Sequence, residues 1–354
     1  MDSHQWHAQA RSSPSPMPEP WTSQQMSTAD ADERRAYAAS VRRALRGRPM
    51  ASPKHDAVAD LLDAALVDAE DEPAGARTLL SLSAPMTLGK SSLIKAWAQR
   101  HHLAWLGTQA GREHPEWSPS PAFDADLVPV IYVTLMARSD ARDLYGMILA
   151  FLGYPGHGLK RDVTMHATRA LATHGVRLLV VDDAHMLNTS SVTGRATLDA
   201  LKQLNTELGE LGGTVVLVGA NLTGGAALND PQIRGRLREH DLHPYRFDTT
   251  DEIRQWQDLL GRAEQPLQAY LPDLAPGTLT SLMGGLIYKR TQGYVGDTSA
   301  LIAGAASTAL SAGRGTITRD DLSGIRLSER AHDGERCLTQ QTPAATTTRR
   351  RRAS

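Results

Sequence analysis

Nine residues decide the fold of this chain: Ala84-Pro85-Met86-Thr87-Leu88-Gly89-Lys90-Ser91-Ser92. A leucine-rich run precedes them at 78–83, and a helical pattern starts at Leu93. A strand, a tight loop with Gly-Lys-Ser and a helix, in this order, are typical of a phosphate-binding P-loop. The backbone N–H groups of such a loop and the positive end of the helix face an anion. The stretch therefore predicts a nucleotide site in an α/β fold.

The residues of this loop have distinct predicted roles. The whole loop would bind phosphates, Lys90 would reach the β- and γ-phosphates, and the Ser91 hydroxyl would ligate Mg²⁺. We therefore expect ATP and Mg²⁺ as ligands. The consensus has a glycine at the position of Ala84, which weakens the match. A chance Gly-Lys-Ser in a loop is the alternative interpretation.

The composition of the 354 residues bounds the class of protein and predicts one to three domains. The formal net charge is −1, so any nucleic-acid surface has to be local. Cys337 is the only cysteine, which excludes a disulfide framework and fits a reducing compartment. No apolar run approaches the roughly 20 residues of a membrane span, and no secretory signal is visible. We expect a cytoplasmic protein with no membrane partner.

A second motif, Leu178-Leu179-Val180-Val181-Asp182-Asp183, ends an apolar strand in two carboxylates. In a P-loop enzyme the first, Asp182, would hold Mg²⁺ directly or through water. Asp183 would polarise the attacking water as a catalytic base. Glutamate is common at this position, and the shorter aspartate shifts the reach by about 1 Å, which can cost on the order of 100-fold in rate. A strand-end cap or turn is the alternative.

Two more polar residues are candidates for catalysis. Asn221 follows the apolar run 214–219 and would orient the attacking water from the opposite side. Three arginines, Arg234, Arg236 and Arg238, lie shortly before the fifth expected strand, and an arginine there would reach the γ-phosphate of an adjoining protomer as an arginine finger. The alternatives are an ordinary turn asparagine and a solvated basic turn.

Predicted strands alternate with helices in the middle of the chain, which is typical of a mostly parallel sheet covered on both faces. The strands are expected at 78–83, 128–135, 176–181, 214–219 and 242–247, with a surface insertion at 102–126. After Thr250 the pattern is helical only. The expected organisation is a disordered tail (1–28), an N-terminal helical segment (29–72), an α/β nucleotide-binding core (73–249), a small α-helical lid domain (250–326) and a disordered basic tail (327–354).

The predicted helix at 29–48 is rich in arginine. Tyr37, Val41 and Leu45 recur at a spacing of four residues on one face, and arginines cover the rest. One interpretation is a solvated basic face on a helix that docks on the core. The other is a contact to DNA phosphates or to an acidic partner.

Taken together, these motifs resemble those of AAA+ ATPases, and within that class those of the TniB family of transposition ATPases, relatives of TnsC. The resemblance spans about His55–Leu322. It is carried by these segments, in order: Gly89-Lys90-Ser91-Ser92, Val130-Ile131-Tyr132-Val133, Gly175-Val176-Arg177-Leu178-Leu179-Val180-Val181-Asp182-Asp183-Ala184-His185, Leu201-Lys202-Gln203-Leu204-Asn205-Thr206-Glu207-Leu208, Val216-Leu217-Val218-Gly219, Asp230-Pro231-Gln232-Ile233 with Arg236, and Thr291-Gln292-Gly293-Tyr294-Val295-Gly296.

The resemblance implies an ATPase that oligomerises on duplex DNA as a ring or filament, recruits a transposase and is reset by hydrolysis. It places Asn221 at the sensor-1 position and Arg236 at the intersubunit finger. A lid arginine is expected after Gly296, but Ser299-Ala300-Leu301 contains none. With Ala84 and Asp183, this makes three departures at the nucleotide. The alternatives are a nucleotide-gated switch with little hydrolysis and an ExeA-type or loader ATPase that acts on protein partners.

Overall fold

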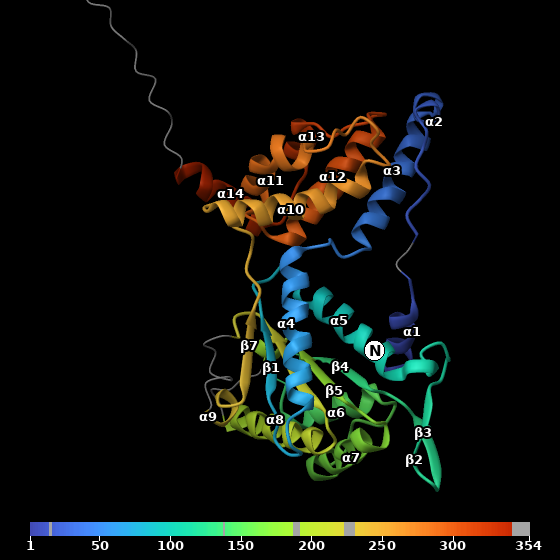
Figure 1. Ribbon diagram of the computed structural model, residues 1–354, viewed down its shortest axis with the longest axis vertical. Coiled ribbons are helices and arrows are strands. Elements are labelled where there is room, and N and C mark those ends of the chain that lie inside the picture. Colours follow the sequence, from blue (N-terminus) through green and yellow to red (C-terminus); the bar gives the residue numbers. More distant parts are fainter. Residues whose placement is uncertain (14–15, 137–138, 187–191, 223–230, 342–354) are drawn as a thin grey trace, which may run out of the picture. The chain divides into compact units, whose positions relative to one another are not determined.

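The chain folds as two units, an α/β unit and a helical unit (Figure 1). The computed structural model describes residues 1–13, 16–136, 139–186, 192–222 and 231–341. Of these, residues 1–13 and 53–243 form the α/β unit, and residues 16–52 and 244–341 form the helical unit. No helix in these ranges is long and apolar enough to cross a membrane.

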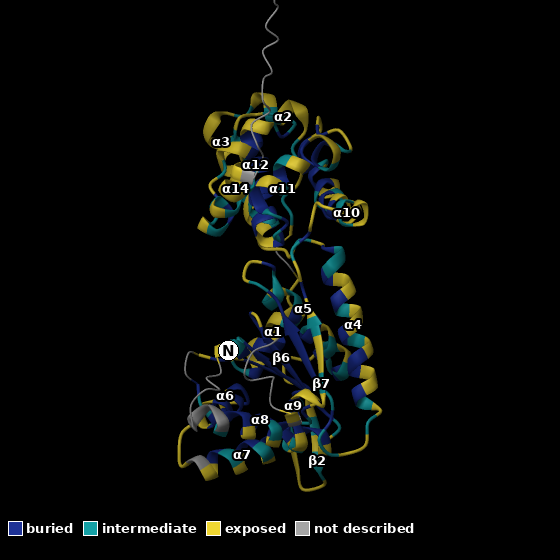
Figure 2. Cartoon of the chain, turned by 90° about the vertical axis from the view of Figure 1, so that its left-hand side faces the viewer, coloured by how far each residue is buried: buried dark blue, intermediate teal, exposed yellow. Residues whose placement is uncertain are grey.

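A five-stranded parallel sheet is the centre of the α/β unit. Its strands lie in the order β4 (Val130–Thr134), β5 (Leu178–Asp182), β6 (Thr214–Gly219), β1 (Leu79–Ser83) and β7 (Leu237–Asp241). Every residue of β1, β5 and β6 is buried, as expected for apolar strands covered on both faces. Figure 2 shows this burial for β6. The edge strand β7 instead exposes charged side chains, which discourage pairing with another chain.

Helices cover this sheet in two groups. One group contains α4 (Pro53–Glu70) and α5 (Lys90–Leu106), and α1 (Ser3–Arg11) packs on α5. The other group contains α6 (Ala141–Phe151), α7 (Lys160–Thr173) and α8 (Val192–Glu210). The remaining short elements of the unit are η1 (Gly107–Gln109), the antiparallel hairpin of β2 (Glu116–Ser120) and β3 (Phe123–Asp126), η2 (Ala184–Met186) and α9 (Pro231–Arg234).

The helical unit is built around α12 (Val295–Ser311), whose small buried residues Ala305, Ala306 and Ala309 allow α3 (Ala31–Arg46) to pack closely against it. The core also includes Trp256 and Ile287. The other elements are α2 (Ser23–Thr28), α10 (Thr250–Leu267), η3 (Thr278–Leu282), α11 (Gly284–Thr291), α13 (Arg319–Gly324) and α14 (Glu329–Gln341). Together they provide the expected helical C-terminal region.

The N-terminal region differs from the expected disordered tail followed by one helical segment. Residues 1–28 contain α1 and α2, and Trp6 is fully buried. Trp21 stacks on Tyr37 at 4.1 Å between ring centroids. Within the segment 29–72, α3 belongs to the helical unit and α4 to the α/β unit. The polar composition of residues 1–28 predicted disorder although the segment contains Trp6 and Trp21. One buried tryptophan supplies enough apolar area to hold a short segment against the fold.

Three other segments also differ from expectation. The fifth strand is Leu237–Asp241, not 242–247, because an edge strand does not need an apolar sequence. The insertion at 102–126 contains the end of α5 and the β2–β3 hairpin. Helix α14 occupies the start of the expected C-terminal tail, and the basic run Arg349–Arg352 lies outside the described residues.

Candidate nucleotide-binding site

The carboxyl ends of three neighbouring strands bring the candidate residues to one edge of the sheet. Strand β6 lies between β1, which leads into the P-loop, and β5, which ends at Asp182. Ser83 pairs with Gly219, and Val181 pairs with Leu217. Because neighbouring strands are about 4.8 Å apart, β1 and β5 lie about 10 Å from each other. The end of β6, with Asn221, therefore lies between the P-loop and the acidic pair.

The P-loop backbone is arranged to receive an anion. Gly89 has a left-handed conformation (φ 81°) and is the N-cap of α5, which starts at Lys90 and has no side-chain cap. Within the described residues, the N–H groups of 86–89 donate no hydrogen bond, and Lys90 has no hydrogen-bond or ion-pair partner. Unpaired N–H groups beside a helix N-terminus form a phosphate-binding concavity. The local geometry thus fits the predicted role of 84–92.

Ala84 occupies the position of the first consensus glycine without backbone strain. It is 1% exposed, and its N–H donates to the Gly219 carbonyl at 3.1 Å. Its φ is not positive, so this position does not require glycine. Gly89 does require it, because an added Cβ would meet the ring of His55 at 3.1 Å in addition to the left-handed φ.

His55, in the first turn of α4, contacts the P-loop through a hydrogen bond. Its Nε2 lies 2.8 Å from the Leu88 carbonyl, and the ring is 9% exposed. Burial lowers the pKa of His55, so the ring is neutral at pH 7 and Nε2–H donates to Leu88. This residue was not singled out from the sequence, since a lone histidine before a helical run carries no signal of its contact with a loop 33 residues away.

Asp182 is held by two hydrogen bonds. Its Oδ1 accepts from the Asp183 N–H at 2.8 Å, and its Oδ2 accepts from the Tyr132 hydroxyl at 2.5 Å. Asp182 is 3% exposed and Tyr132 is 3% exposed. Burial, followed by the Asp182 charge, raises the pKa of Tyr132, which keeps the phenol a neutral donor. The two hydrogen bonds therefore fix the orientation of the carboxylate.

No group of three or more His, Cys, Asp or Glu side chains in the described part of the chain is arranged to hold a metal ion by itself. This does not conflict with magnesium at a nucleotide, because Mg²⁺ usually takes one or two protein ligands together with phosphates and water. Ser91, in the first turn of α5, and Asp182 remain the candidate protein ligands.

Asp183 and Asn221 share an unusual backbone conformation. Both have a positive φ, 54° and 50° respectively, and Thr87 in the P-loop has φ 64°. Only one other non-glycine residue in the described ranges, Gln292, has a positive φ. Strained backbone gathers at functional sites, where the surrounding structure over-determines it. Three residues with a positive φ therefore lie at the carboxyl ends of the strands, where the motifs predict the nucleotide site.

His185 links the acidic pair to β6. Its Nδ1 accepts the Ala220 N–H at 3.3 Å and lies 3.9 Å from Asp183 Oδ1. Accepting at Nδ1 favours the neutral tautomer with the proton on Nε2. The sequence motifs gave no indication of this bridging position.

Behind Asp182, the N-terminal helix contributes a stack of aromatic rings. Trp6 of α1 lies parallel to Tyr132, with 5.3 Å between centroids and an interplanar angle of 16°. Lys95 Nζ of α5 lies 5.3 Å from the centroid of the same Tyr132 ring. The donor to Asp182 is therefore positioned by two helices as well as by its own strand.

Arg236 lies at the amino ends of the parallel strands, opposite the carboxyl ends where the P-loop lies. Its carbonyl accepts the Leu79 N–H at 2.8 Å, at the start of β1, whereas the P-loop follows the end of β1. Five residues of strand separate the two positions by about 16 Å. The exposed Arg236 side chain is thus not part of its own subunit's phosphate loop.

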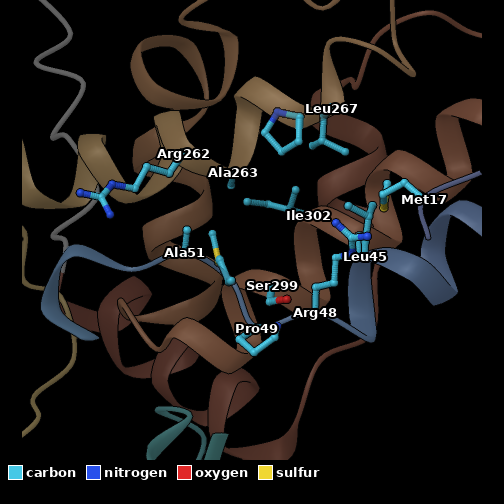
Figure 3. Close-up of a pocket in the computed structure, with 13 residues that line it drawn as sticks. Met17, Leu45, Arg48, Pro49, Ala51, Arg262, Ala263, Leu267, Ser299 and Ile302 are labelled. Carbon is cyan, nitrogen blue, oxygen red and sulfur yellow. The ribbon is translucent and has the colours of Figure 1, made fainter. Parts of the chain in front are cut away.

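The helical unit contains a separate small hollow (Figure 3). It has a volume of about 210 Å³ and is lined mainly by apolar side chains of α3, α10 and α12, among them Leu45, Leu267 and Ile302. Ligand pockets usually measure about 300–1,000 Å³, so this hollow is small for a cofactor.

The sequence of α12 contains no arginine or lysine, so it offers no cation to a phosphate.

Comparison with known proteins agrees with this architecture. A family model described as "Bacterial TniB protein" matches residues 51–247, more than half of the chain. No curated protein matches the chain in sequence.

Two solved structures have a similar fold. The ORC2 protein of Aeropyrum pernix, solved in ADPNP–ADP complexes, has a TM-score of 0.54 at 15% identity, over 81% of this chain and 70% of that chain. Cdc6p from Pyrobaculum aerophilum has a TM-score of 0.51 at 21% identity, over 77% of this chain and 66% of that chain. At such identities the likeness concerns the fold, and the predicted AAA+ fold with a helical C-terminal region is confirmed.

Proposed function

The chain belongs to the TniB family, as its motifs predicted, and from this premise we propose that it is an ATP-dependent regulator of DNA transposition. It assembles on duplex DNA in the cytoplasm as a homo-oligomer and recruits a transposase, and hydrolysis resets the assembly. The observation that carries the proposal is the unpaired phosphate-loop backbone, with Lys90, at the same sheet edge as Asp182, Asp183 and Asn221. The ADPNP and ADP of the ORC2 protein support an adenine nucleotide as the ligand.

In this proposal, residues 84–92 bind the triphosphate and Lys90 contacts its β- and γ-phosphates. Ser91 and Asp182 hold Mg²⁺, which would neutralise charge on the phosphates when bound. Both Asp182 oxygens already accept one hydrogen bond, from Asp183 N–H and Tyr132. Each carboxylate oxygen still has a free lone pair for the metal or for one of its water ligands.

Asp183 and Asn221 would act on the attacking water, Asp183 by accepting its proton and Asn221 by orienting it. The strained backbone at both residues supports a positioning role. Arg236 would serve the site of the neighbouring subunit, because it lies at the edge opposite its own P-loop. Efficient hydrolysis then requires assembly, and the short Asp183 side chain makes it slow.

Substitution of the P-loop lysine tests the proposal. Lys90→Ala should abolish ATP binding, because the γ-phosphate loses its direct cationic partner, whereas the exposed Lys289→Ala in α11 should bind ATP as the unmodified chain does. Binding is measured with a fluorescent ATP analogue. Retained affinity in Lys90→Ala would refute the nucleotide site itself.

Phosphate release distinguishes the second candidate function, a nucleotide-gated switch with little hydrolysis. Asp183 in place of glutamate and the absence of a cation in α12 favour this candidate. Release stimulated by duplex DNA supports the ATPase, and ATP binding without release in either condition supports the switch. If no ATP-dependent DNA binding occurs at ~50 mM salt, a loader-type ATPase that acts on proteins replaces both.

A further inference from the structure

The outward face of α3 carries four exposed arginines. Arg35, Arg42, Arg43 and Arg46 are exposed, whereas Tyr37, Val41 and Ala44 of the same helix are buried. Arg35 pairs with Asp32, three residues before it. Within the described residues, the other three have no ion-pair or side-chain hydrogen-bond partner. Three guanidinium groups on one helix are therefore available to an external anion.

Two adjoining grooves lie along this face. The larger, about 640 Å³, is lined by Arg35, Arg42 and Arg326 together with hydroxyl and small side chains of α12. The smaller, about 470 Å³, is lined by Arg42, Arg43 and Arg46. Arg42 and Ser307 line both grooves, so the two are continuous, and neither is lined by an Asp or Glu. We define this surface as the α3 basic groove.

The chemistry of the α3 basic groove favours a nucleic acid over an acidic protein. Protein interfaces are centred on large apolar or aromatic anchors, but the apolar lining here is limited to Ile325 and small alanines. Protein–DNA interfaces are more polar and more positively charged, and much of their contact is from arginine and hydroxyl groups to phosphates. The lining of arginine, serine and threonine matches that pattern.

The spacing of the arginines also fits a polyphosphate. At 1.5 Å per helical residue, Arg42 and Arg46 are about 6 Å apart along α3, and Arg35 and Arg42 are about 10 Å apart. One strand of DNA presents a phosphate about every 3.4 Å along its axis. Two to three phosphates therefore pass each interval, within reach of long arginine side chains.

We propose that the α3 basic groove binds the phosphate backbone of duplex DNA without sequence preference. The inference rests on the proposed function for the identity of the nucleic acid, and it adds the place of contact, in the helical unit. The helical unit would then bind DNA through electrostatic contacts to phosphates, which do not distinguish one DNA sequence from another.

The test compares the full-length double variant Arg42→Gln/Arg46→Gln with a charge-matched control, Arg161→Gln/Arg169→Gln. The control removes two exposed arginines of α7, which lie outside the groove. Binding to a random-sequence duplex is measured with ATP between 50 and 200 mM salt. Each phosphate contact contributes about 0.9 to the slope of log affinity against log salt. The groove variant should therefore lower the slope by about 1.8 and weaken binding on the order of 10- to 60-fold at 0.1 M salt, while the control changes neither.

The possible results separate the inference from the function beneath it. If the unmodified chain binds DNA and the groove variant has the same slope, the groove is a solvated surface and the inference is overturned. If the unmodified chain binds no DNA, the proposed function fails and the inference with it. If the variant loses binding to a poly-glutamate peptide but retains DNA binding, the groove belongs to an acidic protein partner. ATP binding by the groove variant, measured in parallel, should be unchanged and shows that it is folded.

Discussion

Replacing Trp6 should release the N-terminal helix from the α/β unit. Helix α1 has nine residues and buries only Ser3, Trp6 and His7. A helix this short is not stable alone in water, so packing must hold it. Trp6 is fully buried and stacks on Tyr132. The tryptophan is thus the main apolar contribution to docking of α1.

Two substitutions at Trp6 should differ strongly in their effect on the docking energy of α1. A buried tryptophan removes roughly 150–250 Å² from water, worth about 4–6 kcal/mol at ~25 cal/mol per Å², and measured Trp→Ala costs are about 3–5 kcal/mol. Trp6→Ala should lose about that much. However, Trp6 Nε1–H is buried and has no partner among the described residues, a penalty of about 1–3 kcal/mol. Trp6→Phe keeps a stacked ring and removes this penalty, so it should remain within about 1 kcal/mol of the unmodified chain.

Hydrogen exchange of the α1 amides measures this docking energy directly. A loss of about 3–5 kcal/mol corresponds to a decrease in protection of roughly 10²- to 10³·⁵-fold at 3–11. Trp21→Ala, in the helical unit, should leave α1 protection unchanged and serves as the control. The reasoning fails if Trp6→Ala leaves α1 protected, or if Trp6→Phe is as damaging as Trp6→Ala.

Two other predictions concern neighbours of this helix. Tyr132→Phe removes the hydroxyl that donates to the buried Asp182. The free energy of unfolding, measured by urea titration, should therefore fall by about 1.5–3 kcal/mol. An unchanged free energy of unfolding would mean that the hydrogen bond from Tyr132 to Asp182 does not stabilise the fold. Burial, then the nearby His7, lowers the pKa of His102 from 6.5 to about 4. Because the unfolded chain takes up this proton first as pH falls, stability should be lost below pH 6.5, by about 2 kcal/mol between pH 7 and 5. A His102→Gln variant should lack that component, and an identical pH profile in the variant would contradict it.

The sequence predicts the parts of the fold that depend on local pattern. The four buried strands were located because each is an apolar run ending in a turn or motif, as in Leu178–Asp182. The edge strand β7 was missed because its exposed faces permit charged residues. The place of α3 in the helical unit was missed as well, because packing between residues more than 250 positions apart leaves no trace in local periodicity.

The candidate site shows the same limit. The phosphate loop and the acidic pair are contiguous motifs, so Lys90 and Asp182 were found directly. Tyr132 and His185 act across strands, and their contacts with Asp182 and Ala220 follow from strand order and register. A tyrosine in an otherwise apolar strand, Val130-Ile131-Tyr132-Val133, was the available signal, because a buried hydroxyl needs a partner.

If Arg236 serves the neighbouring subunit as proposed, its position gives an assembly of this chain a direction. The phosphate loop and Arg236 lie at opposite ends of β1, so with the proposed roles two subunits join head to tail through different surfaces. Such a contact closes into a ring or continues as an open filament. In an open filament, one terminal subunit holds ATP that no finger reaches, while the subunit at the other end has a finger without a target. The two ends would then exchange subunits at different rates, so a filament would grow and shorten with polarity.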